Sequence, residues 1–138
     1  MKKWLLLFAL ILVSCDMSES NKKPENFQQV LIATSQKINE MCPMVVDKDT
    51  RLDNTVVLSN KKIQYNYTII NNVAEDFDSD YLNNEFVPNL ITQVKTNPGL
   101  KLFRENDVTF SYYYQDKNGK FILNTVITPK MYIENVIN

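Results

Sequence analysis

An alternating run at residues 62–70 constrains the fold of this chain more than any other stretch. Single polar residues separate its apolar and aromatic members: Ile63, Tyr65, Tyr67 and Ile69. Because successive side chains of an extended chain point to opposite sides, these four share one face. The pattern predicts a β-strand with one buried and one solvated face. Residues 55–58 precede it across a short polar turn and are expected to be its hairpin partner.

A second hairpin is predicted near the end of the chain. Residues 108–114 alternate in the same way, and Asn118-Gly119 then supplies a turn that tolerates positive φ. Residues 121–128 are expected to return beside the first strand, and Pro129 closes the hairpin.

Two longer segments have helical periodicity. Apolar residues at three- and four-residue steps over 27–41 predict an amphipathic helix that ends at Pro43. A second apolar stripe over 82–94 contains Pro88, which requires a kink or a restart of the helix. The order helix, strand, strand, helix, strand, strand predicts an α+β fold. We expect a single two-layer domain, with two main helices packed on a mostly antiparallel four-stranded sheet of two hairpins.

The first fifteen residues predict export. Two lysines precede an unbroken apolar run over 4–13, which at about 1.5 Å per residue covers only half of a bilayer core of roughly 30 Å. The run ends in Leu12-Val13-Ser14-Cys15, which resembles the lipobox of bacterial lipoproteins. That resemblance implies cleavage between Ser14 and Cys15 and lipid chains on Cys15. An ordinary secretory signal with a chance cysteine is the alternative.

The resulting domain plan has three parts. We expect a signal peptide at 1–14, a flexible tether at 15–24 and the α+β domain at 25–138. The protein would then be lipid-anchored to a bacterial membrane and face the periplasm, with inner and outer membrane both open.

Charge and composition exclude several function classes. The chain has 15 basic and 16 acidic residues, and loss of Lys2 and Lys3 with the signal leaves 13 against 16, or −3. A mildly acidic domain without a basic run is a poor partner for nucleic acid. With no histidine in the chain, catalysis by Ser-His-Asp or Cys-His and His-ligated metal sites are excluded. We therefore expect no cofactor, no metal and no catalytic residue of these classes.

Three groups of residues are candidates for a site. Arg51 lies among aspartates, and a guanidinium that bridges carboxylates can order a loop, so we expect a structural ion-pair loop of Asp47, Arg51 and Asp53. Cys42 loses any partner in the chain if Cys15 is acylated, and is expected to be a buried, inert thiol, with pairing to another molecule left open. The third group is the strand segment Tyr112, Tyr113 and Tyr114. Alternation gives both faces of that strand an aromatic side chain, so a peptide-binding surface and ordinary core packing both remain open.

Residues 76–80 begin like a calcium loop. Tyr81 and Val87 stand where an EF-hand needs glycine and glutamate. A helix-capping acidic turn is therefore expected here.

A longer stretch carries a family resemblance. Residues 38–53 read I-N-E-M-C-P-M-V-V-D-K-D-T-R-L-D and resemble a family of small bacterial proteins with a C-P-x-x-V-D-x-x-T-R-L-D core. The part from Asn97 to Met131 is remotely similar to the lipoprotein pilotins of type II secretion, which bind the carboxyl-terminal segment of a secretin and carry it to the outer membrane. Relatives of that kind often have cysteines near Asn97 and Met131, which this chain lacks. The resemblance implies an α+β fold and an exported, anchored module.

Three hypotheses for function follow. The favoured one is a non-enzymatic, pilotin-like module that binds another envelope protein or assists its assembly or targeting. The others are an enzyme with a carboxylate pair, such as Asp47 with Asp53 or Glu75 with Asp76, and a structural lipoprotein of the envelope. A pocket holding carboxylates with raised pKa would favour the enzyme. An exposed apolar groove or an open strand edge would favour the binding module.

Overall fold

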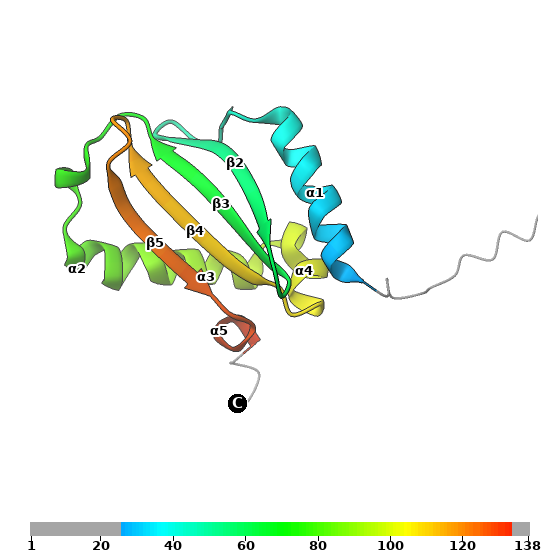
Figure 1. Ribbon diagram of the computed structural model, residues 1–138. Coiled ribbons are helices and arrows are strands. Elements are labelled where there is room, and N and C mark those ends of the chain that lie inside the picture. The colour runs from blue at the N-terminus through cyan, green and yellow to red at the C-terminus, as the bar shows by residue number, and fades with distance from the viewer. Residues whose placement is uncertain (1–25, 134–138) are drawn as a thin grey trace, which may run out of the picture.

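The alternating run forms the central strand of a five-stranded sheet. The computed structural model describes residues 26–133 and orders the strands β1-β2-β3-β4-β5 (Figure 1). Their bounds are β1 Met44–Val45, β2 Thr50–Leu58, β3 Lys62–Ile69, β4 Thr109–Asp116 and β5 Phe121–Ile127. The two predicted hairpins are β2–β3 and β4–β5, and both are antiparallel.

A helical crossover joins the two hairpins. It runs from η1 to α4 and brings β4 back parallel to β3. Its parts are η1 Ala74–Asp76, α2 Ser79–Tyr81, the π-helical turn η2 Leu82–Phe86, α3 Val87–Thr96, η3 Pro98–Leu100 and α4 Lys101–Glu105. Two further helices lie outside the crossover, α1 Phe27–Met41 before the sheet and α5 Pro129–Ile133 after it.

Local signals explain the helix boundaries. The side chain of Asn26 accepts a hydrogen bond from the N–H of Gln28 and caps α1, and Asp78 caps α2 through the N–H of Tyr81. Pro88 is the second residue of α3, which continues without a break from the π-helical turn of η2. In a regular α-helix the proline ring would clash with the carbonyl four residues earlier. The π-helical turn immediately before α3 widens the helix at this point and relieves the clash.

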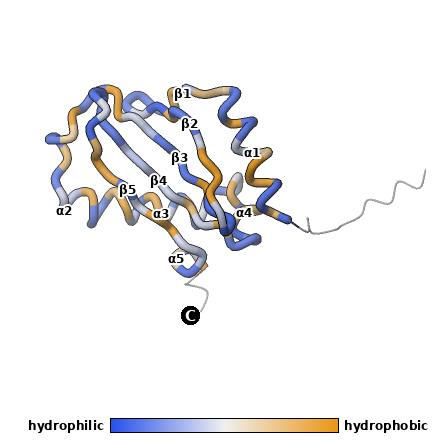
Figure 2. Tube along the Cα trace, viewed as in Figure 1, coloured by the Kyte–Doolittle hydropathy of each residue, from blue (hydrophilic) through white to orange (hydrophobic). Residues whose placement is uncertain are grey.

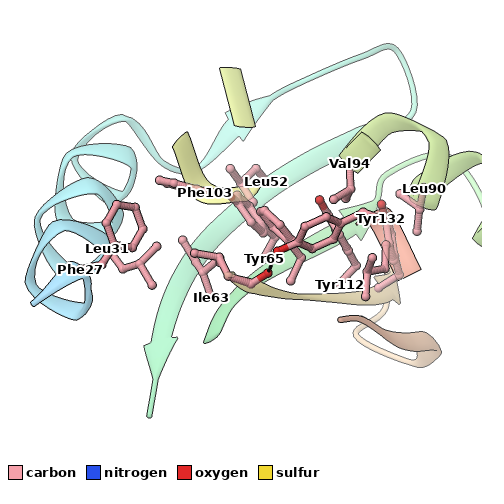
Figure 3. Close-up of a cluster of buried hydrophobic side chains, with 14 of the residues drawn as sticks. Phe27, Leu31, Leu52, Ile63, Tyr65, Leu90, Val94, Phe103, Tyr112 and Tyr132 are labelled. Atoms are coloured by element: carbon pink, nitrogen blue, oxygen red, sulfur yellow. Dashed lines mark hydrogen bonds between the residues drawn. The ribbon is translucent and has the colours of Figure 1, made fainter. Parts of the chain in front are cut away.

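The core lies between the sheet and the helices. In-register pairing of β3 with β4 sets Tyr65 beside Tyr112 and Tyr67 beside Tyr114. Helix α3 contributes Leu90 and Val94, and α1 contributes Phe27 and Leu31 (Figure 3). The hydroxyl of Tyr132 in α5 donates to the carbonyl of Val108 at 2.8 Å, so the last helix is fixed to the start of β4.

Helix α1 covers the outer edge of β2. The side-chain amide of Asn39 accepts from the N–H of Thr55 at 2.7 Å and donates to its carbonyl at 2.8 Å. Gln28 makes a second amide clamp, donating to the carbonyl of Leu58 and accepting from the N–H of Lys61, both at 2.9 Å. These side chains satisfy backbone groups that an added strand would otherwise bind.

The opposite face of the sheet has no helix over it in Figure 1. A network of polar side chains crosses it instead. Asp53 accepts from the hydroxyl of Thr68 at 2.5 Å, and Asn66 joins Gln64 to Asn54 through amide hydrogen bonds of 2.8 and 2.7 Å. Polar side chains keep this face compatible with water, as in many sheets packed on one side only.

The predicted fold class, α+β in one two-layer domain, is confirmed, but several details of the prediction are wrong. The sheet has five strands, because Met44 and Val45 pair with the start of β2. Strand β2 begins at Thr50, so Arg51 and Asp53 belong to a strand, and of the three predicted ion-pair residues only Asp47 lies in the β1–β2 connection. Pro129 begins a helix after it ends β5.

The predicted signal peptide, tether and lipid-attachment residue Cys15 lie outside the described residues. Within residues 26–133 the helices are too short or too polar to cross a membrane.

Candidate functional site

A hollow lies where the β1–β2 connection faces the start of α3. It has a volume of about 290 Å³ and is lined by Val46, Asp47, Thr50, Tyr67, Phe86, Asn89, Leu90, Gln93 and Tyr114. A second hollow of about 360 Å³ shares Asp47, Thr50 and Phe86 with the first and extends toward Ile69, Asn72 and Phe77. Because the two hollows adjoin at Phe86, we call them together the Phe86 groove.

Two stacked tyrosines form the aromatic part of the groove. The rings of Tyr67 and Tyr114 lie 5.0 Å apart and nearly parallel, at 14°. Tyr65 and Tyr112 continue the stack at 5.5 Å, and we call the four residues the tyrosine ladder. Offset stacking of this kind is the arrangement that aromatic quadrupoles prefer.

Phe86 closes the groove on the helical side. Its ring meets Tyr114 edge-to-face, with ring centroids 5.1 Å apart and planes at 81°. The π-helical turn of η2 ends at Phe86, and such turns occur often at functional sites because they change which side chains a helix presents. Asn89 and Gln93 are exposed on α3 and add amide groups to the lining.

Side-chain hydrogen bonds fix the β1–β2 connection. Asp47 accepts from the N–H of Asp49 at 2.8 Å, which is an Asx turn. Asn71 donates from its amide to the carbonyl of Lys48 at 2.9 Å and to the carboxylate of Asp49 at 2.8 Å. The connection is thus tied to the end of β3, and this wall of the groove is preformed.

The wall of the groove that the β1–β2 connection forms is acidic. Its lining contains the carboxylates of Asp47 and Asp49 and the ammonium of Lys48, which lies 3.4 Å from Asp49. The Asn71 hydrogen bond and the nearby charge of Lys48 lower the pKa of Asp49 despite partial desolvation. Asp49 is therefore ionised at neutral pH and is not a proton donor of the kind that carboxylate enzymes require.

Burial is the main influence on the pKa values of Tyr67 and Tyr114. Desolvation, with smaller contributions from the Cys42 thiolate and the Asp47 carboxylate, raises the pKa of Tyr67 to about 12. Burial also raises the pKa of Tyr114, and the neighbouring Tyr67 and Asp47 add to the effect. Both phenols remain neutral at physiological pH, and both side chains line the groove.

The structure separates the three predicted tyrosines. Tyr112 and Tyr114 are buried on the helix-covered face, with exposed fractions of 8 and 6%. Tyr113 is half-buried on the open face, where its ring lies 5.7 Å from that of Phe121. Only Tyr114 of the three contributes to the groove.

Arg51 and Asp53 form a pair on the open face. The Nε of Arg51 lies 2.6 Å from Oδ1 of Asp53, and the two side chains are 40 and 20% exposed. Asp47 lines the groove and does not share this pair. Cys42 is half-buried, and burial followed by the charge of Asp53 raises the pKa of its thiol.

The other proposed carboxylate pair has structural roles. Glu75 contacts Lys120, and this hydrogen bond is the main reason that the pKa of Glu75 is lowered. Asp76 accepts from the N–H of Val73 at 3.0 Å. Among residues 26–133, the acidic and cysteine side chains do not gather into a group of three that could hold a metal ion.

Sequence reasoning missed most of the groove. Tyr67 and Phe86 were predicted only as apolar positions of a strand and a helix, and Asn89 and Gln93 were not singled out. The groove brings together Val46, Tyr67, Phe86 and Tyr114, which lie far apart in the sequence. Sequence spacing contains no signal that such distant residues are neighbours. The one sequence feature that marks the region is the motif ending in Thr50-Arg51-Leu52-Asp53.

Comparisons with known proteins show which family and which solved structures this chain resembles. Residues 27–123 match a family described as domain of unknown function (DUF8479). No curated protein matches the sequence. Among solved structures, a Pseudomonas aeruginosa protein described as secreted superimposes with a TM-score of 0.65 at 12% identity, covering 77% of this chain and 92% of that one.

Two pilotins of type II secretion systems have the same fold. The pilotin EpsS of Vibrio vulnificus superimposes with a TM-score of 0.62 at 7% identity, over 77% of this chain and 91% of its own. The pilotin AspS of Vibrio cholerae gives 0.60 at 5% identity, over 77 and 92%. The remote similarity inferred from the second half of the sequence is confirmed at the level of the fold.

Proposed function

Since the chain belongs to the DUF8479 family and shares its fold with type II secretion pilotins, we propose that it is a non-enzymatic, pilotin-like binding module of the cell envelope. The protein binds a segment of another envelope protein in the Phe86 groove and assists its assembly or targeting. The observation that carries the proposal is the groove itself, a preformed hollow with stacked aromatic side chains and an acidic wall.

The groove defines the chemistry of the partner segment. Phe86, Tyr67 and Tyr114 suit an apolar anchor, because aromatic side chains at the centre of an interface provide most of its binding energy. Asp47 and Asp49 favour a lysine or arginine next to that anchor. Exposed acidic residues also flank Phe77 and Phe86 in the chain, namely Asp76, Asp78 and Glu85. The partner is therefore a short segment with an apolar anchor and a basic neighbour.

Anchoring belongs to the same proposal. Lipid chains on Cys15 would hold the domain at a membrane, and the tether at 15–24 would leave the groove free to reach its partner. Two or three acyl chains together provide a lasting anchor, whereas a single chain binds only marginally.

Site-specific photo-crosslinking in intact cells tests the binding site. A photo-reactive amino acid at Asn89 should give a discrete adduct with one envelope protein, because Asn89 lines the groove and is exposed. The same amino acid at Val56, an exposed position of β2 outside the groove, is the matched control. Asp47→Arg, which reverses the charge of the acidic wall, should weaken the adduct at Asn89.

A deletion strain tests the proposed role. If the protein targets its partner, the crosslinked protein should change its distribution between inner and outer membrane when the gene is removed. Equal adducts at Asn89 and Val56, or an unchanged distribution of the partner, would overturn the proposal.

A further inference from the structure

Strand β5 forms a long free edge of the sheet. Among the strands of residues 26–133 it occupies the last position and pairs only with β4. Its seven residues are Phe121–Ile127, whereas the strand at the opposite edge, β1, has two. An edge of this length offers a row of unpaired backbone groups to another strand.

Hydrogen-bond alternation identifies the groups that point outward. The N–H of Thr109 donates to the carbonyl of Lys61 before β3, so odd-numbered residues of β4 face β3 and even-numbered ones face β5. The bond from the N–H of Asp116 to the carbonyl of Lys120 agrees with this. Thr125 is paired with Tyr112 and therefore uses its backbone toward β4, which leaves the N–H and C=O groups of Asn124 and Val126 pointing away from the sheet.

The part of β2 that extends beyond β1 is protected in a way that β5 is not. There, the amide side chains of Asn39 and Gln28 occupy outward backbone groups of Thr55 and Leu58. Within residues 26–133, no side chain makes an equivalent hydrogen bond to the outward groups of Asn124 or Val126. Asn124 and Val126 are both exposed.

The sequence of β5 also lacks the usual guards against pairing. Phe-Ile-Leu-Asn-Thr-Val-Ile contains no charged residue and no proline, and it is hydrophobic along most of its length (Figure 2). Phe121 and Val126 are 55 and 38% exposed. Lysine, proline or an inward charge on an edge strand normally prevents association, and β5 has none of them.

We propose that β5 pairs antiparallel with β5 of a second copy, so that two sheets join into one. The outward N–H and C=O groups of one strand must face those of the other. This requirement sets Asn124 of one copy opposite Val126 of the other and Thr125 on the two-fold axis. The strand is uncharged, so two copies meet without charge repulsion, and the outward backbone groups of Asn124 and Val126 pair reciprocally about the axis. Pairing stops at two copies because a two-fold interface uses the β5 edge of both molecules and is therefore closed.

Disulfide crosslinking in intact cells tests this pairing on the full chain. Thr125 residues that face each other across the axis form a non-hydrogen-bonded pair, with Cα atoms about 4.5 Å apart, within the range that a disulfide spans. Thr125→Cys should therefore give a covalent dimer under mild oxidation. The parent chain, which contains Cys42, and the Val56→Cys variant, on the open face of β2, should not give this dimer.

Two further variants show that the edge itself is responsible. Val126→Pro removes an outward N–H without removing a bond to β4, and Val126→Lys places a charge at the edge. Either change should abolish the dimer of Thr125→Cys. Val56→Lys, at a valine of similar exposure on the same face, should leave it intact. A Thr125→Cys chain that gives no more dimer than its parent, or a dimer that survives both Val126 changes, would overturn the proposal. This readout does not involve the Phe86 groove.

Discussion

At the scale of single residues, Arg51 is the one cation among the aspartates at 49 and 53, and the structure gives it Asp53 as a partner. The pair with Asp53 is on a solvated face, and Arg51 is 40% exposed. Exposed pairs contribute about 1 kcal/mol or less, whereas breaking a buried one costs roughly 3–5 kcal/mol. We therefore expect Arg51→Ala to lower the free energy of unfolding by about 1 kcal/mol, and Arg51→Lys by less, because lysine retains the charge but not the planar donor.

Chemical denaturation of the two variants measures this effect, with Lys48→Ala as the control because its side chain is 90% exposed. If Arg51→Ala left stability unchanged but weakened partner binding, Arg51 would be a recognition residue and its ion pair incidental.

Asp116 shows what residue-level sequence reasoning missed. Its side chain is almost fully buried and accepts from the backbone N–H groups of Ala74, Asn118 and Lys120 at 2.8 to 2.9 Å. Burial alone would raise the pKa of this carboxyl, but the three donors outweigh burial and lower it. Asp116 thus fixes the β4–β5 turn and ties it to η1. The turn was predictable from Asn118-Gly119, but the donor from a segment 42 residues away was not.

At the scale of elements, the tyrosine ladder predicts an alkaline limit to stability. The pKa of Tyr67 is about 12 in the folded protein, against 10.0 for a free phenol. Above pH 10 the unfolded chain therefore loses its phenolic proton first, and stability should fall as the pH rises from about 10 toward 12. This contribution is fully present below pH 10. Each tyrosine of the ladder can contribute up to about 2 kcal/mol to the loss.

Thermal melts across this pH range, with tyrosinate absorbance recorded during unfolding, check the prediction. Tyr67→Phe should flatten the pH dependence, since phenylalanine cannot ionise. Tyr81→Phe is the control, because Tyr81 is 42% exposed. Ionisation of all seven tyrosines near pH 10 without unfolding would contradict a buried ladder.

At the scale of elements, sequence patterns were sufficient to predict some strands and helices but not others. Strands β3 and β4 were predictable because period-two alternation directly reflects one buried face. Strand β1 was not, because two residues contain no period, and the start of β2 was hidden by Arg51 and Asp53, whose polar side chains lie on the solvated face. The parallel pairing of β3 with β4 depends on the path of the crossover, which no local pattern specifies. Helix α5 was missed because Pro129 indicates the end of a strand and the first turn of a helix equally well.

At the scale of the whole molecule, the proposed anchor predicts the mass of the mature protein. If the lipobox is processed, detergent-extracted protein should weigh more than residues 15–138 by a diacylglycerol and an acyl group. Ser14 and Cys15 are the residues responsible, so Cys15→Ser should abolish the increase and release the protein from the membrane. Intact mass spectrometry measures both. A water-soluble product with unmodified Cys15 would contradict lipid anchoring and leave the groove proposal standing.

We expect the in-register junction of β3 with β4 to set the order in which this chain folds. Each hairpin closes a loop of a few residues, but the side chains of Gln64 and Ser111, which meet across the junction, are 47 residues apart. Long loops close more slowly and at a greater entropic cost than short turns. The two hairpins can therefore form early and independently, and the sheet is completed last, when the crossover helices pack. The tyrosine ladder lies on this junction, so we expect the Phe86 groove to be among the last parts of the molecule to form.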